Sequence, residues 1–227
     1  LENLKKEGFN ISNKGKATID NPFVYHCGDI MYDNSLYFSE VSDEKSTILN
    51  ELGLEKNNFI LSTIHRDSNT DIHENLESIF KALIVISEES NQRIVLPLHP
   101  RTKGKLETHL SEELRMKLIQ SENILIIPPA GFLDIIALEK NSKMIVTDSG
   151  GLQKEAFFFE KPCIILRPQT EWIEIVENGN AILVDADYNR ILEAFNSLSA
   201  KNDFSYPTLY GDGKSAEFIC EQIIEHI

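Results

Sequence analysis

The chain has 227 residues, of which 41% are hydrophobic and 26% are charged, and its formal net charge at pH 7 is -14. This composition is typical of a globular protein of one or two domains, and the negative charge argues against nucleic acid and anionic membranes as partners. The sequence shows neither a signal peptide nor an apolar run of about 20 residues, and its three cysteines lack metal-ligand spacing, so we expect a cytoplasmic protein without a metal site.

The first 47 residues predict the end of one structural region and the approach to another. Residues 1–9 are expected to form a short helix closed by Gly8, and residues 23–27 are expected to form a strand. A single strand needs partners, so we expect the chain to begin within a domain whose earlier part precedes Leu1. Residues 29–47 are expected to be a helix or linker.

From residue 59 onward, short apolar stretches alternate with amphipathic ones. Strands are expected at residues 59–64, 93–98, 124–127, 144–147, 163–166 and 181–184. Helices are expected at residues 72–88, 103–119, 132–139, 152–159, 172–177, 191–199 and 215–227. This alternation predicts an α/β fold with a Rossmann-like, doubly wound parallel sheet.

Polar loops follow five of the expected strands. They are His65-Arg66, His99-Pro100-Arg101, the Pro-Pro-Ala-Gly-Phe stretch ending at Phe132, Ser149-Gly150-Gly151 and Arg167-Pro168-Gln169. Open α/β sheets bind ligands outside the carboxyl ends of their strands, so these loops predict a ligand site at one edge of the sheet.

The Ser149-Gly150-Gly151 turn has the features of an anion site. Ser149 is expected to cap the following helix, whose first amides are free to bind phosphate. Two adjacent glycines allow a ligand to approach the backbone closely and allow a positive φ. Glu155 lies about one helical turn further on, where its carboxylate can bind a ribose diol. The alternative interpretation is an ordinary capped helix after a glycine turn.

Several segments resemble the UDP-N-acetylglucosamine 2-epimerase family. TDSGGLQKEAFFFEKPCIILRPQTEWIE is similar to its T-D-S-G-G-x-Q-E-E-A, K-P and R-x-x-T-E-x-x-E patterns. STIHRDSNTDIHENL is similar to T-x-H-R-x-E-N, LPLHPRT to P-x-H, IPPAGFLDIIAL to P-x-G-Y-x-x-F, and LYGDGKSAEFI to the closing N-P-Y-G-D-G-x-A segment. These motifs occur in the family's order.

The resemblance implies the second domain of a two-domain glycosyltransferase-B architecture. Residues 1–46 would be the tail of the N-terminal Rossmann-like domain and a linker, and residues 47–205 the C-terminal nucleotide-binding domain. Residues 206–227 would return towards the N-terminal domain. The whole protein is expected to be a homodimer that supplies sugars for surface polysaccharide, without a cofactor.

The resemblance also assigns roles to individual residues. Ser149, Gly150 and Gly151 would bind the pyrophosphate, Glu155 the ribose, and Phe132 would lie near the uracil. Arg167, Thr170 and Glu171 would line the sugar-phosphate end, with Arg66 and His99 approaching the cleft, and His65 would be catalytic. The resemblance implies that UDP is eliminated and then added back. Ser68 and Lys154 replace glutamates that are usual in the family.

Other interpretations remain open at this stage. The substrate is either UDP-N-acetylglucosamine or a related UDP-diacetamido sugar. A UDP-sugar glycosyltransferase of the same architecture would use the same nucleotide half, and a non-catalytic UDP-sugar-binding module would need only that half. A receiver-like domain would require an Asp cluster after the first strand, which the sequence lacks.

Overall fold

The computed structural model describes residues 1–226 of the chain. These residues fall into two compact units. Residues 35–207 form the larger unit, and residues 1–34 together with the segment from residue 208 onward form the smaller unit. Every strand that the structure assigns among the described residues belongs to the larger unit.

The larger unit is built on a parallel sheet of six strands in the order β3-β2-β1-β4-β5-β6. The strands are β1 (Phe59–Thr63), β2 (Arg93–Pro97), β3 (Ile124–Ile127), β4 (Met144–Thr147), β5 (Cys163–Ile165) and β6 (Ala181–Leu183). All neighbouring pairs run parallel, so the predicted doubly wound parallel sheet is confirmed. The strand order reverses between β1 and β4, which is where such sheets bind ligands.

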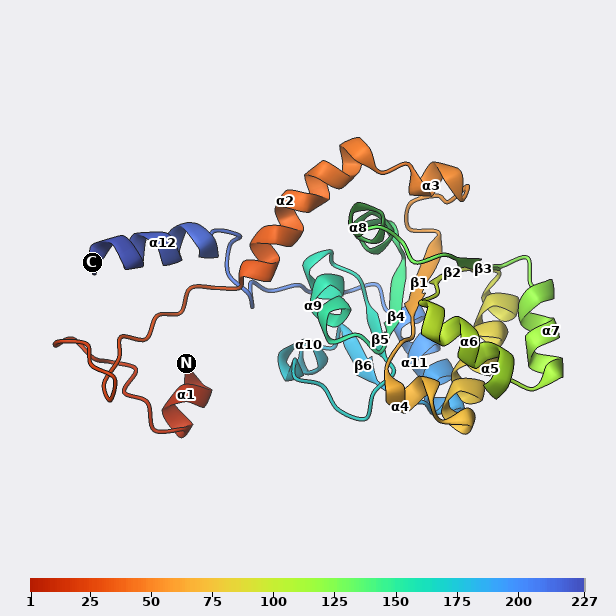
Figure 1. The fold of residues 1–227 in the computed structure, drawn as a ribbon, viewed down its shortest axis with the longest axis horizontal. Helices are drawn as coiled ribbons and strands as arrows, with labels where there is room; N and C mark the ends of the chain where they lie inside the picture. The colour runs from red at the N-terminus through yellow and green to blue at the C-terminus, as the bar shows by residue number, and fades with distance from the viewer. Residues whose placement is uncertain (227) are drawn as a thin grey trace. The chain divides into compact units, whose positions relative to one another are not determined.

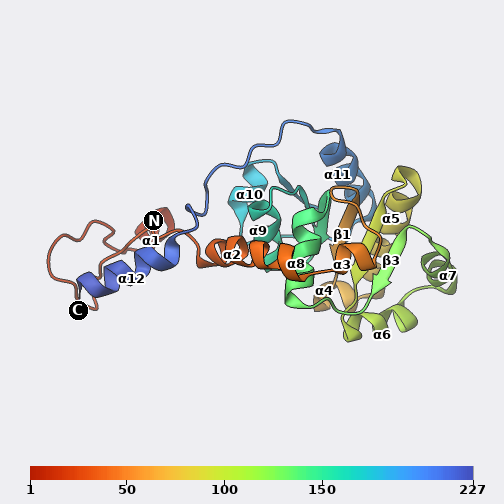
Figure 2. The ribbon, with the colours of Figure 1, turned by 90° about the horizontal axis from the view of Figure 1, so that it is seen from above.

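Helices cover both faces of this sheet (Figure 1). One layer consists of α5 (His73–Ser90), α6 (Pro100–His109), α7 (Glu112–Gln120) and α11 (Tyr188–Ala200), whose apolar residues share one buried cluster with Ile60 and Val146 of the strands. On the other side, α8 (Phe132–Asn141) and α9 (Gly150–Phe158) lie side by side (Figures 1 and 2). Leu61 and Ile145, which alternate with the cluster residues, are also fully buried.

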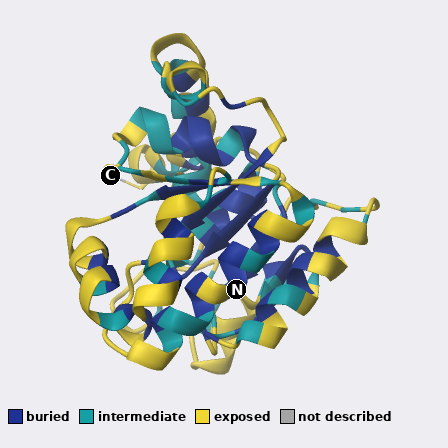
Figure 3. Ribbon diagram, turned by 90° about the vertical axis from the view of Figure 1, so that its right-hand side faces the viewer, coloured by how far each residue is buried: buried dark blue, intermediate teal, exposed yellow. Residues whose placement is uncertain are grey.

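Burial of the strands on both faces explains why they are continuous apolar runs rather than alternating ones. Figure 3 shows them as the buried centre between helices whose outer sides are exposed. Phe80 and Leu83 of α5 are 0% exposed, and burial of each such side chain contributes about 1.5–3 kcal/mol. Cys163 is buried in β5, and its burial raises the pKa of the thiol.

Some helix boundaries differ from the sequence prediction. The helix expected at residues 103–119 is in fact α6 and α7, because Leu110 and Ser111 have extended backbones. Ser111 is the N-cap residue of α7, and Glu112 and Glu113 in the first turn are the local signal for that start. The short helices α3 (Ile48–Glu51) and α4 (Asp67–Thr70) were not expected, whereas α10 (Ile173–Glu177) corresponds to the helix expected at residues 172–177.

The smaller unit contains α1 (Glu2–Lys6), the start of α2 (Ile30–Lys45) and α12 (Ser215–Glu225). The strand predicted at residues 23–27 is wrong: this segment has no strand partner among the described residues. Its aromatic side chains instead contact α12 and the residue that follows this helix. The Tyr25 ring lies 6.1 Å from the Phe218 ring, and the Phe23 ring lies 4.8 Å from the His226 ring. An apolar extended segment can therefore pack its side chains against a helix without joining a sheet.

Candidate active site

The candidate site lies at the carboxyl ends of β1 and β4, where the strand order reverses. Thr63 and Thr147 end these two strands side by side, and their hydroxyl oxygens are 2.6 Å apart. The polar loops of the sequence prediction follow directly, so the parallel sheet brings them to one edge as expected.

Asp148, the first residue after β4, organises this edge and was not recognised from the sequence. It is fully buried, and its carboxylate accepts hydrogen bonds from the backbone amides of His65 (3.0 Å) and Arg66 (2.9 Å) and from the side-chain amide of Asn69 (3.1 Å). A buried carboxylate is costly unless several donors satisfy it, and these donors tie the loop after β1 to the end of β4.

The side chain of His65 is oriented by the same carboxylate. Its Nδ1 lies 3.3 Å from Oδ1 of Asp148, while 48% of the side chain is exposed. A carboxylate beside Nδ1 favours the tautomer with hydrogen on Nδ1, which leaves Nε2 as an acceptor. The pair therefore has the arrangement of a general base held in position by an aspartate.

The glycine turn begins α9 as predicted. Ser149 is the N-cap, and its hydroxyl accepts a hydrogen bond from the amide of Leu152 at 3.4 Å. The expectation of a positive φ is wrong, because Gly150 and Gly151 are the first two residues of the helix and neither has a positive φ. The glycines therefore matter for the space that they leave and not for an unusual backbone.

Charged side chains surround the space beside Gly150. An added Cβ there would lie 3.6 Å from the guanidinium of Arg167, 3.7 Å from that of Arg66 and 3.7 Å from the carboxylate of Glu171. The helix N-terminus and two guanidiniums converge on this space, which suits an anion such as a phosphate.

Arg167 and Glu171 form a bidentate ion pair. Arg167 is 7% exposed, and its Nη1 and Nη2 donate to the two carboxylate oxygens of Glu171 at 2.8 and 2.6 Å. The hydrogen bonds from Arg167 lower the pKa of Glu171 to about 2. Thr170, between them in sequence, donates its hydroxyl hydrogen to Oε1 of Gln153 at 2.6 Å and so ties this loop to α9.

Two carboxyl groups, one on α8 and one on α9, lie close enough for their charges to interact. Glu139 of α8 is 1% exposed and its Oε2 has no hydrogen-bond partner, so burial raises its pKa well above the ordinary value, and the charge of Glu155 raises it further. Burial also raises the pKa of Glu155, and the charge of Lys154 opposes that rise. The sequence reading singled out Glu155 but missed Glu139.

A cavity of about 440 Å³ opens beside the turn. Its lining comes from the ends of β1, β2 and β3 and from α8 and α9: Thr63, Ile64, His65, Pro97, His99, Arg101, Pro129, Ala130, Ile135 and Leu152. His65 and His99 therefore meet in one hollow. Phe132 does not line it: the ring is 58% exposed and packs edge-on against Phe38, with centroids 4.9 Å apart.

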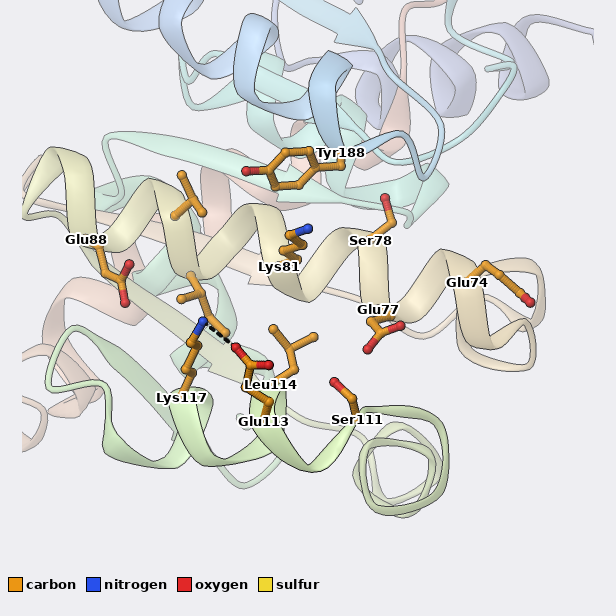
Figure 4. A pocket seen from close by; sticks show the side chains of 12 residues that line it. Glu74, Glu77, Ser78, Lys81, Glu88, Ser111, Glu113, Leu114, Lys117 and Tyr188 are labelled. Atoms are coloured by element: carbon orange, nitrogen blue, oxygen red, sulfur yellow. Dashed lines mark ion pairs between the residues drawn. The ribbon is translucent and has the colours of Figure 1, made fainter.

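A second cavity, of about 540 Å³, lies between α5, α7 and the start of α11 (Figure 4). Both of its lysines already have partners within it: Lys117 pairs with Glu113 at 2.9 Å, and Lys81 lies over the Tyr188 ring at 5.0 Å. None of the loops that follow the carboxyl ends of the strands lines this cavity. We therefore place the candidate site at the first cavity and the adjoining glycine turn.

Residues 1–226 are the part of the chain that the structure describes. No group of three or more His, Cys, Asp and Glu side chains in this range is arranged to hold a metal ion. Within the same range, no helix is long and apolar enough to cross a membrane.

Comparison with known proteins gives a family match for this chain. The family model described as UDP-N-acetylglucosamine 2-epimerase matches residues 2–224. A relative from Methanococcus maripaludis, named UDP-N-acetylglucosamine 2-epimerase homolog, is 41% identical over 96% of this chain and 56% of its own length. A relative from Pseudomonas aeruginosa, named UDP-2,3-diacetamido-2,3-dideoxy-D-glucuronate 2-epimerase, is 39% identical over 98% of this chain and 56% of its own length.

Solved structures show the same fold. The UDP-GlcNAc 2-epimerase of Methanocaldococcus jannaschii, crystallised in complex with UDP-GlcNAc and UDP, matches 99% of this chain and 58% of that one. The TM-score is 0.80 and the sequence identity is 32%. The chain therefore spans a little over half the length of the relatives that it matches.

Proposed function

Since this chain belongs to the UDP-N-acetylglucosamine 2-epimerase family, we propose that it is the UDP-binding half of an enzyme that interconverts UDP-N-acetylglucosamine and UDP-N-acetylmannosamine. The observation that carries this proposal is the convergence of Arg66 and Arg167 on the space beside Gly150, at the N-terminus of α9. A chain with a net charge of -14 has no general attraction for a diphosphate, so local donors of this kind must supply it.

The nucleotide would be held along α9. In this proposal Ser149, Gly150 and Gly151 bind the pyrophosphate through the first turn of the helix, and Glu155 accepts hydrogen bonds from the ribose hydroxyls. Phe132 lies near the uracil, where its exposed ring is accessible to a base. The raised pKa of Glu155 fits a carboxylate in a partly enclosed site, where a diol is a suitable donor.

The sugar end would meet the cavity and the Arg167 loop. Arg167, Thr170 and Glu171 line the sugar-phosphate side, and the bidentate ion pair holds the guanidinium in place before a ligand arrives. Arg66 and His99 approach the cleft from the loops after β1 and β2.

The proposed reaction requires UDP to leave and return. The proton at carbon 2 of the sugar is removed, the bond from carbon 1 to the phosphate oxygen breaks, and the electron pair leaves with UDP. UDP then adds back to carbon 1 of the resulting 2-acetamidoglucal on the face that it left. The proton adds to carbon 2 on the face opposite to the one from which it was removed, so that carbon 2 alone is inverted. Oriented amides and guanidiniums stabilise the charge on the leaving diphosphate. His65, positioned by Asp148, is the acid-base group that this chain brings to the cavity.

The remaining parts of the proposal concern the whole protein. Residues 47–205 would act as its C-terminal nucleotide-binding domain, residues 1–46 as the tail of the N-terminal domain with a linker, and residues 206–227 as the segment returning to that domain. The whole protein would be a cytoplasmic homodimer that works without a cofactor and supplies sugars for surface polysaccharide. The relatives' lengths support a larger protein, because this chain spans 56% of them.

Isothermal titration calorimetry of this chain with UDP tests the proposed binding. We expect saturable binding of UDP and weaker binding of uridine, because uridine lacks the diphosphate that the turn and the guanidiniums recognise. No heat of binding with UDP at millimolar concentration would contradict the proposal.

A further inference from the structure

Trp172, the single tryptophan of the chain, touches the glycine turn directly. Its indole Nε1 donates a hydrogen bond to the carbonyl oxygen of Gly150 at 2.8 Å. Its own backbone amide donates to the hydroxyl of Thr170 at 3.1 Å, and that hydroxyl is bonded to Gln153 of α9. The residue is therefore fixed to the first turns of α9 through both its side chain and its backbone.

This hydrogen bond acts on the peptide group that the phosphate would meet. The carbonyl of Gly150 and the amide of Gly151 belong to one planar trans peptide, so they point in opposite directions. A donor that holds the carbonyl consequently fixes the direction of the Gly151 N–H, which points out of the helix N-terminus. Two glycines at the start of a helix are the residues with most conformational freedom to lose, so this turn benefits from an external support.

Lys154 supports the indole from its face. Its side-chain nitrogen lies 4.2 Å from the centre of the Trp172 ring and 5.9 Å from that of Phe158, and the residue is 5% exposed. A cation over an indole face is attracted by the ring's quadrupole, most strongly where water is excluded. Lys154 is also one helical turn beyond Gly150, so both contacts lie on the same side of α9.

We propose that Trp172 and Lys154 form an indole clamp that positions the phosphate-binding turn. Trp172 holds the Gly150 carbonyl, and Lys154 holds the indole in the orientation that makes this bond. Both are positioning residues and neither needs to touch the ligand. The clamp's effect on UDP rests on the proposed function, whereas its effect on the turn does not.

The ligand-free protein tests the clamp itself. Trp172→Phe keeps an aromatic ring but removes the N–H donor, and Lys154→Met removes the charge at nearly constant length. By ¹⁵N relaxation, we expect the order parameter of the Gly151 amide to fall from about 0.85 towards 0.6 in both variants. The Ile145 amide in β4 should keep its value, and Lys154→Arg, which retains the cation, should resemble the wild type. An unchanged Gly151 order parameter in a folded Trp172→Phe variant overturns the proposal; if that variant does not fold, an unchanged value in Lys154→Met does so.

Calorimetry tests the consequence for binding. We expect Trp172→Phe to weaken UDP about tenfold, the upper end for one hydrogen bond, and Lys154→Met by a smaller factor. The loss should be confined to UDP, since uridine does not use the phosphate-binding turn. Equal losses for UDP and uridine, or unchanged UDP affinity, would contradict a positioning role.

Lys81→Met is the matched control. It makes the same substitution at a lysine that also lies over an aromatic ring, that of Tyr188, but in the second cavity. UDP affinity should not change in this variant, and an equal loss there would overturn the clamp. Failure of the wild-type chain to bind UDP would instead contradict the proposed function, while the order parameter of Gly151 would still decide whether the clamp exists.

Discussion

The two units of the chain use apolar residues in different ways. In the larger unit, helices cover both faces of the sheet, and residues such as Phe80 and Leu83 are 0% exposed. In the smaller unit, Ile19 is 99% exposed and Ile224 is 74% exposed. Tyr210 is the one buried hydrophobic residue among the described residues of this unit. An apolar segment becomes core only where a second layer covers it. The larger unit is therefore expected to hold its structure and its site, whereas the smaller unit contributes little to the stability of this chain.

Matched phenylalanine substitutions test this difference most strongly. Phe80→Ala, in the core of the larger unit, should lower the free energy of unfolding by about 3–5 kcal/mol. Phe218→Ala, which removes the ring packed against Tyr25 in the smaller unit, should cost about 1 kcal/mol, because this side chain is only partly buried. Urea unfolding followed by the fluorescence of Trp172 reports on the larger unit. Equal shifts for the two variants would show that the units unfold as one.

Gly150→Val separates the site from the fold within the larger unit. A Cβ at this position makes ordinary contacts of 3.6–3.7 Å, so the helix should form, but the valine methyl groups would enter the space between Arg66 and Arg167. We expect a normal circular dichroism spectrum and a loss of UDP affinity of at least about 100-fold, or roughly 2.7 kcal/mol. Unchanged affinity in calorimetry would show that the anion does not bind beside Gly150.

Glu155→Ala examines the ribose end of the same site. We expect UDP to bind about 1.5–3 kcal/mol more weakly, the scale for hydrogen bonds to a charged group. The variant should lose less affinity for 2'-deoxy-UDP, because that ligand lacks one of the two hydroxyls. Glu88→Ala, which removes a carboxylate from the second cavity, is the control and should bind UDP normally. Equal losses for the two nucleotides would show that the proposed contact to the 2'-hydroxyl is wrong.

The buried carboxyl group of Glu139 should make the stability of the folded protein depend on pH, with a smaller effect than the substitutions above. Burial raises its pKa above the ordinary value of 4.5, so the folded protein retains the proton to higher pH than the unfolded chain does. This contribution to stability is fully present below about pH 4.5 and is lost as the pH rises through the folded pKa. Glu139→Gln has no such loss, so its stability relative to the wild type should increase as the pH rises from 5 to 8.

Urea midpoints measured across this pH range test the prediction for Glu139. Glu113→Gln, at an exposed surface ion pair on α7, is the control and should show no comparable increase. A constant difference between Glu139→Gln and the wild type across the range would mean that the carboxyl group is not held in its neutral form.

Much of the larger unit was predictable because its signals are local. Apolar runs such as Met144–Thr147 marked the strands, and Ser149 with two following glycines marked the start of α9. The parallel sheet then required the loops after the strands to share an edge, which brought His65 and His99 together.

The contacts that shape the site were less predictable because they join residues far apart in sequence. Asp148 binds the loop at His65 and Arg66, more than 80 residues away, and the indole of Trp172 reaches Gly150 across 22 residues. Nothing in the local pattern indicates such partners. The failed strand at residues 23–27 has the same cause, since a strand depends on a neighbour that the local sequence does not specify.

The central claim is that this chain binds UDP without carrying out the epimerisation. The loops proposed to bind the nucleotide all belong to the larger unit, but this chain spans only 56% of the relatives' length. His65 is the single acid-base group that the proposal assigns to this chain. The direct measurement is incubation with UDP-N-acetylglucosamine in heavy water, with NMR detection of the proton at sugar carbon 2 and with the Methanocaldococcus jannaschii enzyme as positive control. The account predicts that UDP binds and that the carbon 2 proton persists. Solvent deuterium at carbon 2, entering at a rate near that of the control, would show that this chain carries the catalyst.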